Sequence, residues 1–131
     1  MAGTTLCSVA LLAGAAVALS RLRRVTVIGA SMEPTLREGD RLVVVTGMHP
    51  RVGALVAVRD PRAATDRMLV KRVKEIGRDG LDVRGDAASS STDSRTFGPV
   101  PLALVEGTVV WRYGPPGRAG RIPARPAADP K

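Results

Sequence analysis

Short runs of β-branched and apolar residues follow one another along most of this 131-residue chain, and each run ends at a glycine, proline or aspartate turn signal. Runs of this kind are typical of strands joined by turns. The runs that predict strands are 41–45, 52–59, 68–76, 81–84 and 105–113. The sequence contains no internal repeat and no long amphipathic helical pattern. It therefore predicts a mainly β fold, a small curled or barrel-like antiparallel domain over residues 25–113.

An uncharged segment rich in alanine, leucine and valine precedes this domain at residues 4–20. As a helix, its apolar run would be about 24 Å long, slightly short of the ~30 Å hydrocarbon core of a bilayer. A signal peptide would begin with basic residues, which Met1–Thr5 lack, and a buried helix would need a partner that the β-rich remainder does not offer. We interpret the segment as a single transmembrane helix that anchors the domain.

The formal net charge of +8 lies mainly in two basic arms outside the predicted domain core. Arginines at 21, 23 and 24 follow the apolar segment, and a basic cluster beside such a segment suits anionic lipid headgroups. Residues 114–131 are rich in Pro, Gly and Arg and predict a disordered basic tail. Removal of this tail is expected to leave the function of the domain intact. The rest of the chain is nearly balanced in charge and the whole chain has three aromatic residues, so nucleic acid is not a predicted partner.

The chain has one cysteine and one histidine, which excludes several kinds of site. Cys7 has no partner for a disulfide within the chain and no neighbouring ligands for zinc. His49 precedes a proline in a turn and is expected to be a surface residue. No metal site and no cofactor are predicted.

Ser31 lies in the stretch GASMEPTLREGDRLVVV, residues 29–45, where small residues precede it and a strand follows. Gly39-Asp40 indicates a tight turn before that strand. Ser31 is therefore expected at the edge of a β-unit where another backbone can come close. An ordinary turn serine is the alternative interpretation.

Lys71 lies in a strand beside apolar residues, and taken alone it would be an outward-facing side chain. Together with Ser31 it suggests a different role, because a serine hydroxyl is a weak nucleophile unless a base takes its proton. Burial among apolar groups lowers the pKa of a lysine and makes it such a base. The two residues are thus candidates for a Ser-Lys dyad.

Four short motifs occur in order along the domain, and together they resemble one family. They are Ser31–Leu36 (SMEPTL), Gly39-Asp40 before the strand 42–45, Lys71–Val73 (KRV), and Gly85-Asp86 with 91–95 (STDSR) and 98–100 (GPV). This order resembles the type I signal peptidases, in particular their short forms typified by the mitochondrial inner-membrane proteases. The large inserted β-subdomain of longer bacterial members is absent, and Ala87 stands where the family has an asparagine.

The resemblance implies roles for individual residues. Ser31 would attack the scissile carbonyl, with its backbone N–H stabilising the oxyanion, and Lys71 would be the general base that Ser91 orients. Some members add an oxyanion donor two residues before the nucleophile, where this chain has Gly29. Apolar substrate pockets are implied for Val27, Met32, Leu36 and Val70. Structural ion pairs are implied between Arg72 and Asp86 and between Asp93 and Arg95.

The function implied is that of a membrane-anchored, single-pass serine endopeptidase that removes N-terminal leader or signal peptides after small residues. Its partners would be precursor proteins, the lipid bilayer and, since the mitochondrial relatives work as pairs, a partner subunit. Processing of secreted proteins implies an extracytoplasmic catalytic domain, whereas the basic cluster after the helix favours the cytoplasm.

Two alternatives are kept. One is a cytoplasmic-facing maturation protease for a dedicated precursor, as in the branch that matures nickel superoxide dismutase. The other is a non-catalytic, membrane-tethered β module that binds extended peptides. The second is disfavoured because Ser31, Lys71 and Ser91 are all present.

Overall fold

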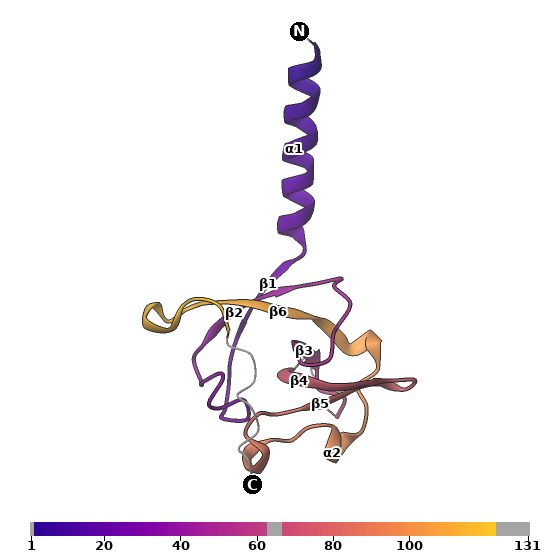
Figure 1. Cartoon of the computed structure of the whole chain (residues 1–131), viewed down its shortest axis with the longest axis vertical. Coiled ribbons are helices and arrows are strands. Elements are labelled where there is room, and N and C mark those ends of the chain that lie inside the picture. The colour runs from indigo at the N-terminus through magenta and orange to yellow at the C-terminus, as the bar shows by residue number, and fades with distance from the viewer. Residues whose placement is uncertain (1, 63–66, 123–131) are drawn as a thin grey trace.

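The computed structural model describes residues 2–62 and 67–122. The helix α1 (Ala2–Ser20) leads into a domain built on one six-stranded sheet (Figure 1). The strands are β1 (Leu22–Thr26), β2 (Arg41–Val45), β3 (Leu55–Arg59), β4 (Met68–Gly77), β5 (Gly80–Arg84) and β6 (Val105–Gly114). Short helical segments lie in the connections: η1 (Ala88–Ser90), α2 (Ser94–Phe97), η2 (Leu102–Leu104) and η3 (Pro116–Arg118).

The sheet is antiparallel throughout, in the order β1-β2-β6-β3-β4-β5, which confirms the predicted mainly β antiparallel class. The predicted barrel-like closure is wrong, because β1 and β5 are edge strands that do not pair with each other. Instead of strand pairing, hydrogen bonds join the segment after β1 to the segment after β5. The Ala87 N–H donates to the Ser31 carbonyl oxygen at 3.0 Å, and the Thr35 hydroxyl donates to Asp86 at 2.6 Å.

The central strand β3 is buried on both faces, because successive side chains of a strand point to opposite sides. Leu55 and Ala57 belong to one apolar cluster and Val56 and Val58 to the other. The first cluster also contains Val27, Met32, Leu36, Leu42, Val44, Val70 and Val109. The second also contains Val73, Leu81, Val83 and Val100. Burial of these side chains is the main force that holds the sheet together.

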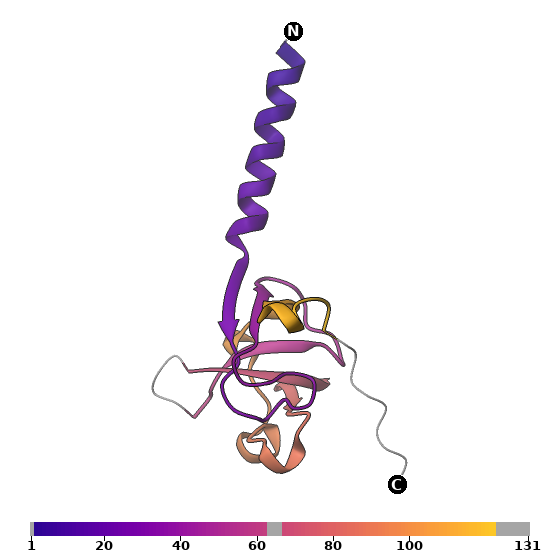
Figure 2. The same cartoon turned by 90° about the vertical axis from the view of Figure 1, so that its left-hand side faces the viewer.

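The N-terminal helix α1 extends away from the sheet (Figures 1 and 2), and its side chains from Thr4 to Ser20 are exposed. Its 19 residues are about 28 Å long at 1.5 Å per residue. Among the residues that the structure describes, no helix is long and apolar enough to cross a membrane. The predicted transmembrane anchor at residues 4–20 is therefore not supported.

Two chain segments differ from the sequence prediction. Residues interpreted as a basic arm form β1, which pairs with β2 in the register Arg24 opposite Val43. Within the predicted tail, η3 follows β6, Gly120 bridges to Arg112, and Ile122 packs against the first apolar cluster. The tail prediction therefore does not hold for residues 114–122, and its remainder, 123–131, lies outside the described residues.

Candidate active site

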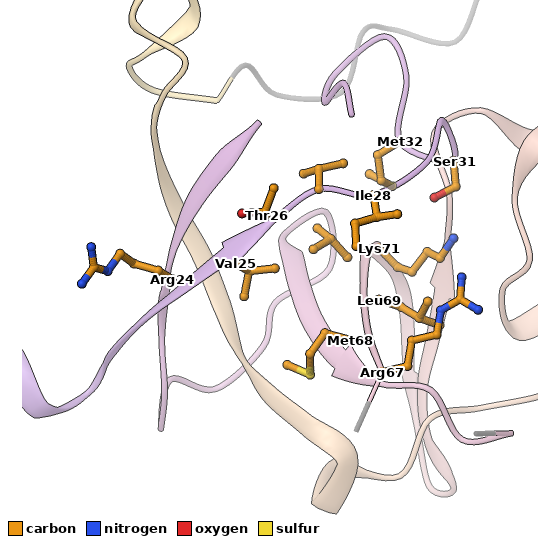
Figure 3. Close-up of a pocket in the computed structure, with 12 residues that line it drawn as sticks. Arg24, Val25, Thr26, Ile28, Ser31, Met32, Arg67, Met68, Leu69 and Lys71 are labelled. Atoms are coloured by element: carbon orange, nitrogen blue, oxygen red, sulfur yellow. The ribbon is translucent and has the colours of Figure 1, made fainter. Parts of the chain in front are cut away.

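A pocket of about 430 Å³ lies between two strand segments, with Ser31 and Lys71 among its lining residues (Figure 3). One wall is the segment 24–28, which runs from the edge strand β1 toward Ser31. The other is the segment 67–71 at the start of β4. That part of β4 pairs with β3 on one side only, because β5 joins β4 from Arg72 onward. Within residues 2–62 and 67–122, β1 and the first part of β4 thus each have a strand neighbour on one side only, and both border the pocket.

Lys71 is the buried amine of this pocket, with a side chain that is 2% exposed. Its Nζ donates a hydrogen bond to Ser91 Oγ at 3.1 Å. Burial lowers the pKa of Lys71 below its usual value, and the charges of Arg62 and Arg95 act in the same direction, while Asp93 opposes them. The neutral amine is therefore favoured at a lower pH than in an exposed lysine.

Ser91 connects Lys71 to the fully buried Asp93. The Ser91 hydroxyl donates to Asp93 Oδ2 at 2.9 Å, which commits its only proton and leaves its lone pairs to accept from Lys71. Asp93 Oδ2 also accepts from the Gly85 N–H at 2.9 Å and from Arg95 Nη2 at 2.8 Å. Although burial raises the pKa of Asp93, these hydrogen bonds outweigh it and hold that pKa well below its usual range.

Ser31 lies in the turn after β1, half-buried, two residues beyond Gly29, whose φ is +84°. Figure 3 shows the Ser31 hydroxyl and the Lys71 amine at the same end of the pocket. Within the described residues the Ser31 hydroxyl makes no hydrogen bond, to Lys71 or to any other group.

Gly85 lies between Ser31 and Ser91, and both can come close to it because it has no side chain. A Cβ at position 85 would be 2.1 Å from Ser91 Oγ and 2.6 Å from the Ser31 carbonyl oxygen. Any other residue there would displace one of the two serines. The sequence includes Gly85 in a motif, but no local signal shows this steric requirement.

The two ion pairs proposed from sequence are both formed in the structure. Arg72 donates two hydrogen bonds to Asp86, each 2.8 Å long. Asp86 also accepts a hydrogen bond from the Thr35 hydroxyl in the turn after Ser31. Arg95 bonds Asp93, as described above. The Arg72–Asp86 pair joins β4 to the connection that carries Ser91, and the Arg95–Asp93 pair lies within that connection.

The proposed substrate-pocket residues divide into two groups. Val27, Met32 and Val70 line the pocket, whereas Leu36 is not among the lining residues and is fully buried in the first apolar cluster. Its N–H bonds to the Met32 carbonyl oxygen at 2.9 Å, and this turn directs the Leu36 side chain inward. The pocket also contains Val25, Met68 and Leu69, with Arg24 and Arg67 among the lining residues, none of which the sequence proposed.

A metal site is not indicated by the side chains present. Over residues 2–62 and 67–122, no group of three or more His, Cys, Asp or Glu residues is arranged to hold a metal ion.

Comparison with known proteins places the chain among the peptidases. Residues 2–84 match the family described as signal peptidase, peptidase S26. The mitochondrial ATP-independent inner membrane protease subunit 1a of Arabidopsis thaliana is 32% identical, over 72% of this chain and 71% of that protein. The mitochondrial inner membrane protease subunit 1 of Xenopus tropicalis is 30% identical, over 66% of each. The chain belongs to the signal peptidase S26 family, which confirms the resemblance found in its motifs.

Proposed function

We propose that this protein is a serine endopeptidase that removes N-terminal leader peptides after small residues, with Ser31 as nucleophile and Lys71 as general base. The observation that carries the proposal is the placement of a buried lysine and a serine at one end of an open pocket, with Ser91 bonded to the lysine. Membership of the peptidase family supports the reaction class.

In the proposed mechanism, the neutral Lys71 amine takes the proton of the Ser31 hydroxyl as Oγ attacks the scissile carbonyl carbon. The protonated amine then gives that proton to the leaving amine, and an acyl ester forms on Ser31. Lys71 next takes a proton from the water that attacks the ester, and then gives this proton to Ser31 Oγ as the carboxylic acid product leaves, which restores the neutral amine and the free hydroxyl. The Ser31 backbone N–H would stabilise the oxyanion, and one such donor contributes about 3–4 kcal/mol in other enzymes.

Ser91 is proposed to orient the amine without consuming its lone pair. Because the Ser91 proton is committed to Asp93, Ser91 accepts a hydrogen bond from Lys71. A neutral amine that donates one N–H to Ser91 keeps its lone pair for the Ser31 proton. The buried Asp93 thus acts on Lys71 through Ser91.

The substrate is proposed to bind as an extended strand between the edges of β1 and β4. An extended peptide can bond to the unpaired backbone groups of such edges, with alternate side chains entering pockets. Val27, Met32 and Val70 form the apolar surface next to Ser31. Small residues at the first and third positions before the cut would fill this surface.

The protein is further proposed to act at a membrane, with the catalytic domain on the extracytoplasmic side, and together with a partner subunit. The membrane and the partner subunit are supported by the relatives, which are named as subunits of mitochondrial inner membrane proteases. The extracytoplasmic side is proposed from the resemblance to peptidases that process secreted proteins.

Cleavage of a fluorogenic peptide with alanine at the first and third positions before the cut tests this proposal. The matched control is the same peptide with tryptophan at both positions. We expect cleavage of the alanine peptide alone, measured by fluorescence and by mass of the products. Binding of the alanine peptide without cleavage would contradict the proposal and indicate a peptide-binding module.

The rate of this cleavage is expected to rise from mildly acidic to alkaline pH. Burial lowers the pKa of Lys71, so its neutral form accumulates as the pH rises through a value below the ~10.4 of an exposed lysine. The measurement is kcat/KM from pH 5 to 9, with Lys74→Ala as control because Lys74 is exposed on the same strand. A profile without pH dependence would argue against lysine as the base.

A further inference from the structure

Asp40 is a buried carboxylate that ends the turn carrying Ser31, and it is 1% exposed. Its Oδ2 accepts from the Arg37 N–H at 3.0 Å and from Arg112 Nη1 at 3.1 Å. Arg118, in η3, bonds both oxygens, with Nε to Oδ1 at 3.1 Å and Nη2 to Oδ2 at 3.0 Å. Among the described contacts, Arg118 is the only donor to Oδ1.

The two arginines are fixed to each other as well as to the turn. Arg112 Nη1 also donates to the Thr35 carbonyl oxygen at 3.2 Å, and Arg112 Nε donates to the Arg118 carbonyl oxygen. Gly120 and Arg112 exchange backbone hydrogen bonds of 2.8 and 3.1 Å. Residues 118–120 therefore fold back along β6, where Gly120 pairs antiparallel with Arg112, and they bring Arg118 to the turn.

Side chains and backbone groups from several segments hold the turn from Ser31 to Asp40, including backbone bonds that join Gly39 and Asp40 to Val27. Ala87 bonds the Ser31 carbonyl oxygen, and Asp86 accepts from the Thr35 hydroxyl. A further attachment is Asp40 with its two arginines. The Ala87 and Asp86 attachments come from the connection after β5, and the attachment at Asp40 comes from Arg112 in β6 and Arg118 after it. Loss of Arg118 would leave Asp40 Oδ1 without its described donor, while Arg112 and the backbone bonds to Val27 would remain.

We propose that Arg118 is a positioning residue: by binding Asp40 it fixes the turn that carries Ser31 relative to Lys71. Its catalytic consequence rests on the proposed function. Deletion of residues 114–131, expected from the sequence to be harmless, removes Arg118 and is now expected to impair cleavage.

The Arg118→Ala variant is expected to fold. The Arg118 side chain is 25% exposed, so water can enter and partly solvate Asp40, while Arg112 and the Arg37 N–H keep their bonds. Water does not hold the turn in one position as a two-point arginine bond does. The expected defect is therefore positional.

The experiment compares Arg118→Ala, Arg118→Lys and the control Arg121→Ala. Arg121 lies on the same segment and is exposed. Measurements are kcat and KM on the alanine peptide, the thermal midpoint, and amide hydrogen exchange by residue. For Arg118→Ala we expect kcat to fall about 10- to 100-fold, the loss that a displacement near 1 Å can cause, with KM nearly unchanged. Arg118→Lys should recover part of the loss, because lysine keeps the charge but bonds at one point. Arg121→Ala should match the parent protein.

Hydrogen exchange separates a failure of this proposal from a failure of the proposed function, because it needs no activity. Faster exchange in Arg118→Ala confined to residues 31–40 would support the positioning role even if the parent protein cleaves nothing. Unchanged exchange in that turn would overturn it, whatever the activity. Faster exchange across the whole sheet would also overturn it, since Arg118 would then be a general stabilising residue.

Discussion

Replacing Ser31 by alanine is expected to lower kcat/KM for the alanine peptide by a factor on the order of 10⁴ or more, the scale of nucleophile loss in other serine proteases. The proposed reaction cannot form its acyl ester without Ser31 Oγ. The thermal midpoint should not change, because in the described structure the hydroxyl makes no hydrogen bond that would be lost. Cleavage is measured with excess substrate and with excess enzyme, so that a slow single turnover is detected.

The matched control for this variant is Ser89→Ala, an exposed serine of the connection that also carries Ser91. It should cleave at the parent rate. Full activity in Ser31→Ala would show that another group is the nucleophile and would remove the proposed mechanism. Equal loss in both variants would show that the connection, rather than the hydroxyl of Ser31, is what matters.

Lys71→Arg is expected to be as inactive as Lys71→Ala. Arginine keeps the positive charge and can still donate to Ser91, but it stays protonated near neutral pH and cannot accept the Ser31 proton. The substitution therefore separates a lysine that acts as a base from one that acts only through its charge. The measurement is kcat/KM for both variants at pH 7 and pH 9.

Lys71→Met serves as a folding control, because it keeps the length and apolar character of a side chain that is 2% exposed in the parent protein. It should fold and be inactive. Lys74→Arg, on the exposed part of the same strand, should remain active. Substantial cleavage by Lys71→Arg would contradict the proposed mechanism, because charge alone would then be sufficient.

Strand prediction from the sequence succeeded where apolar residues alternate or cluster between turn residues. Strands β2, β4, β5 and β6 begin and end within one residue of the prediction. The third strand begins at Leu55 rather than Val52, since Gly53 has a φ of +89° and belongs to a turn. Strand β1 was missed because its arginines resemble a flanking basic cluster, and its pairing with β2 is a contact between distant segments.

For the candidate site too, the sequence predicted some features correctly and missed others. The motifs predicted Ser31, Lys71 and Ser91 as a group; Ser31 and Ser91 lie next to Gly85, and Lys71 bonds to Ser91. Leu36 was assigned to the substrate pocket from its place in the serine motif, but the turn at Met32 directs it into the core. Motif spacing does not reveal which way a side chain points after a turn.

The sequence by itself determined the class of fold, the family and the residues that carry the candidate chemistry, because periodicity and short motifs are local properties of the chain. Only the tertiary structure decided that the sheet stays open, that Lys71 is buried enough to lower its pKa, and that residues 114–122 are part of the domain. Each of these depends on contacts between distant segments. Arg118 and Asp40 are 78 residues apart, and no local pattern encodes such a pair.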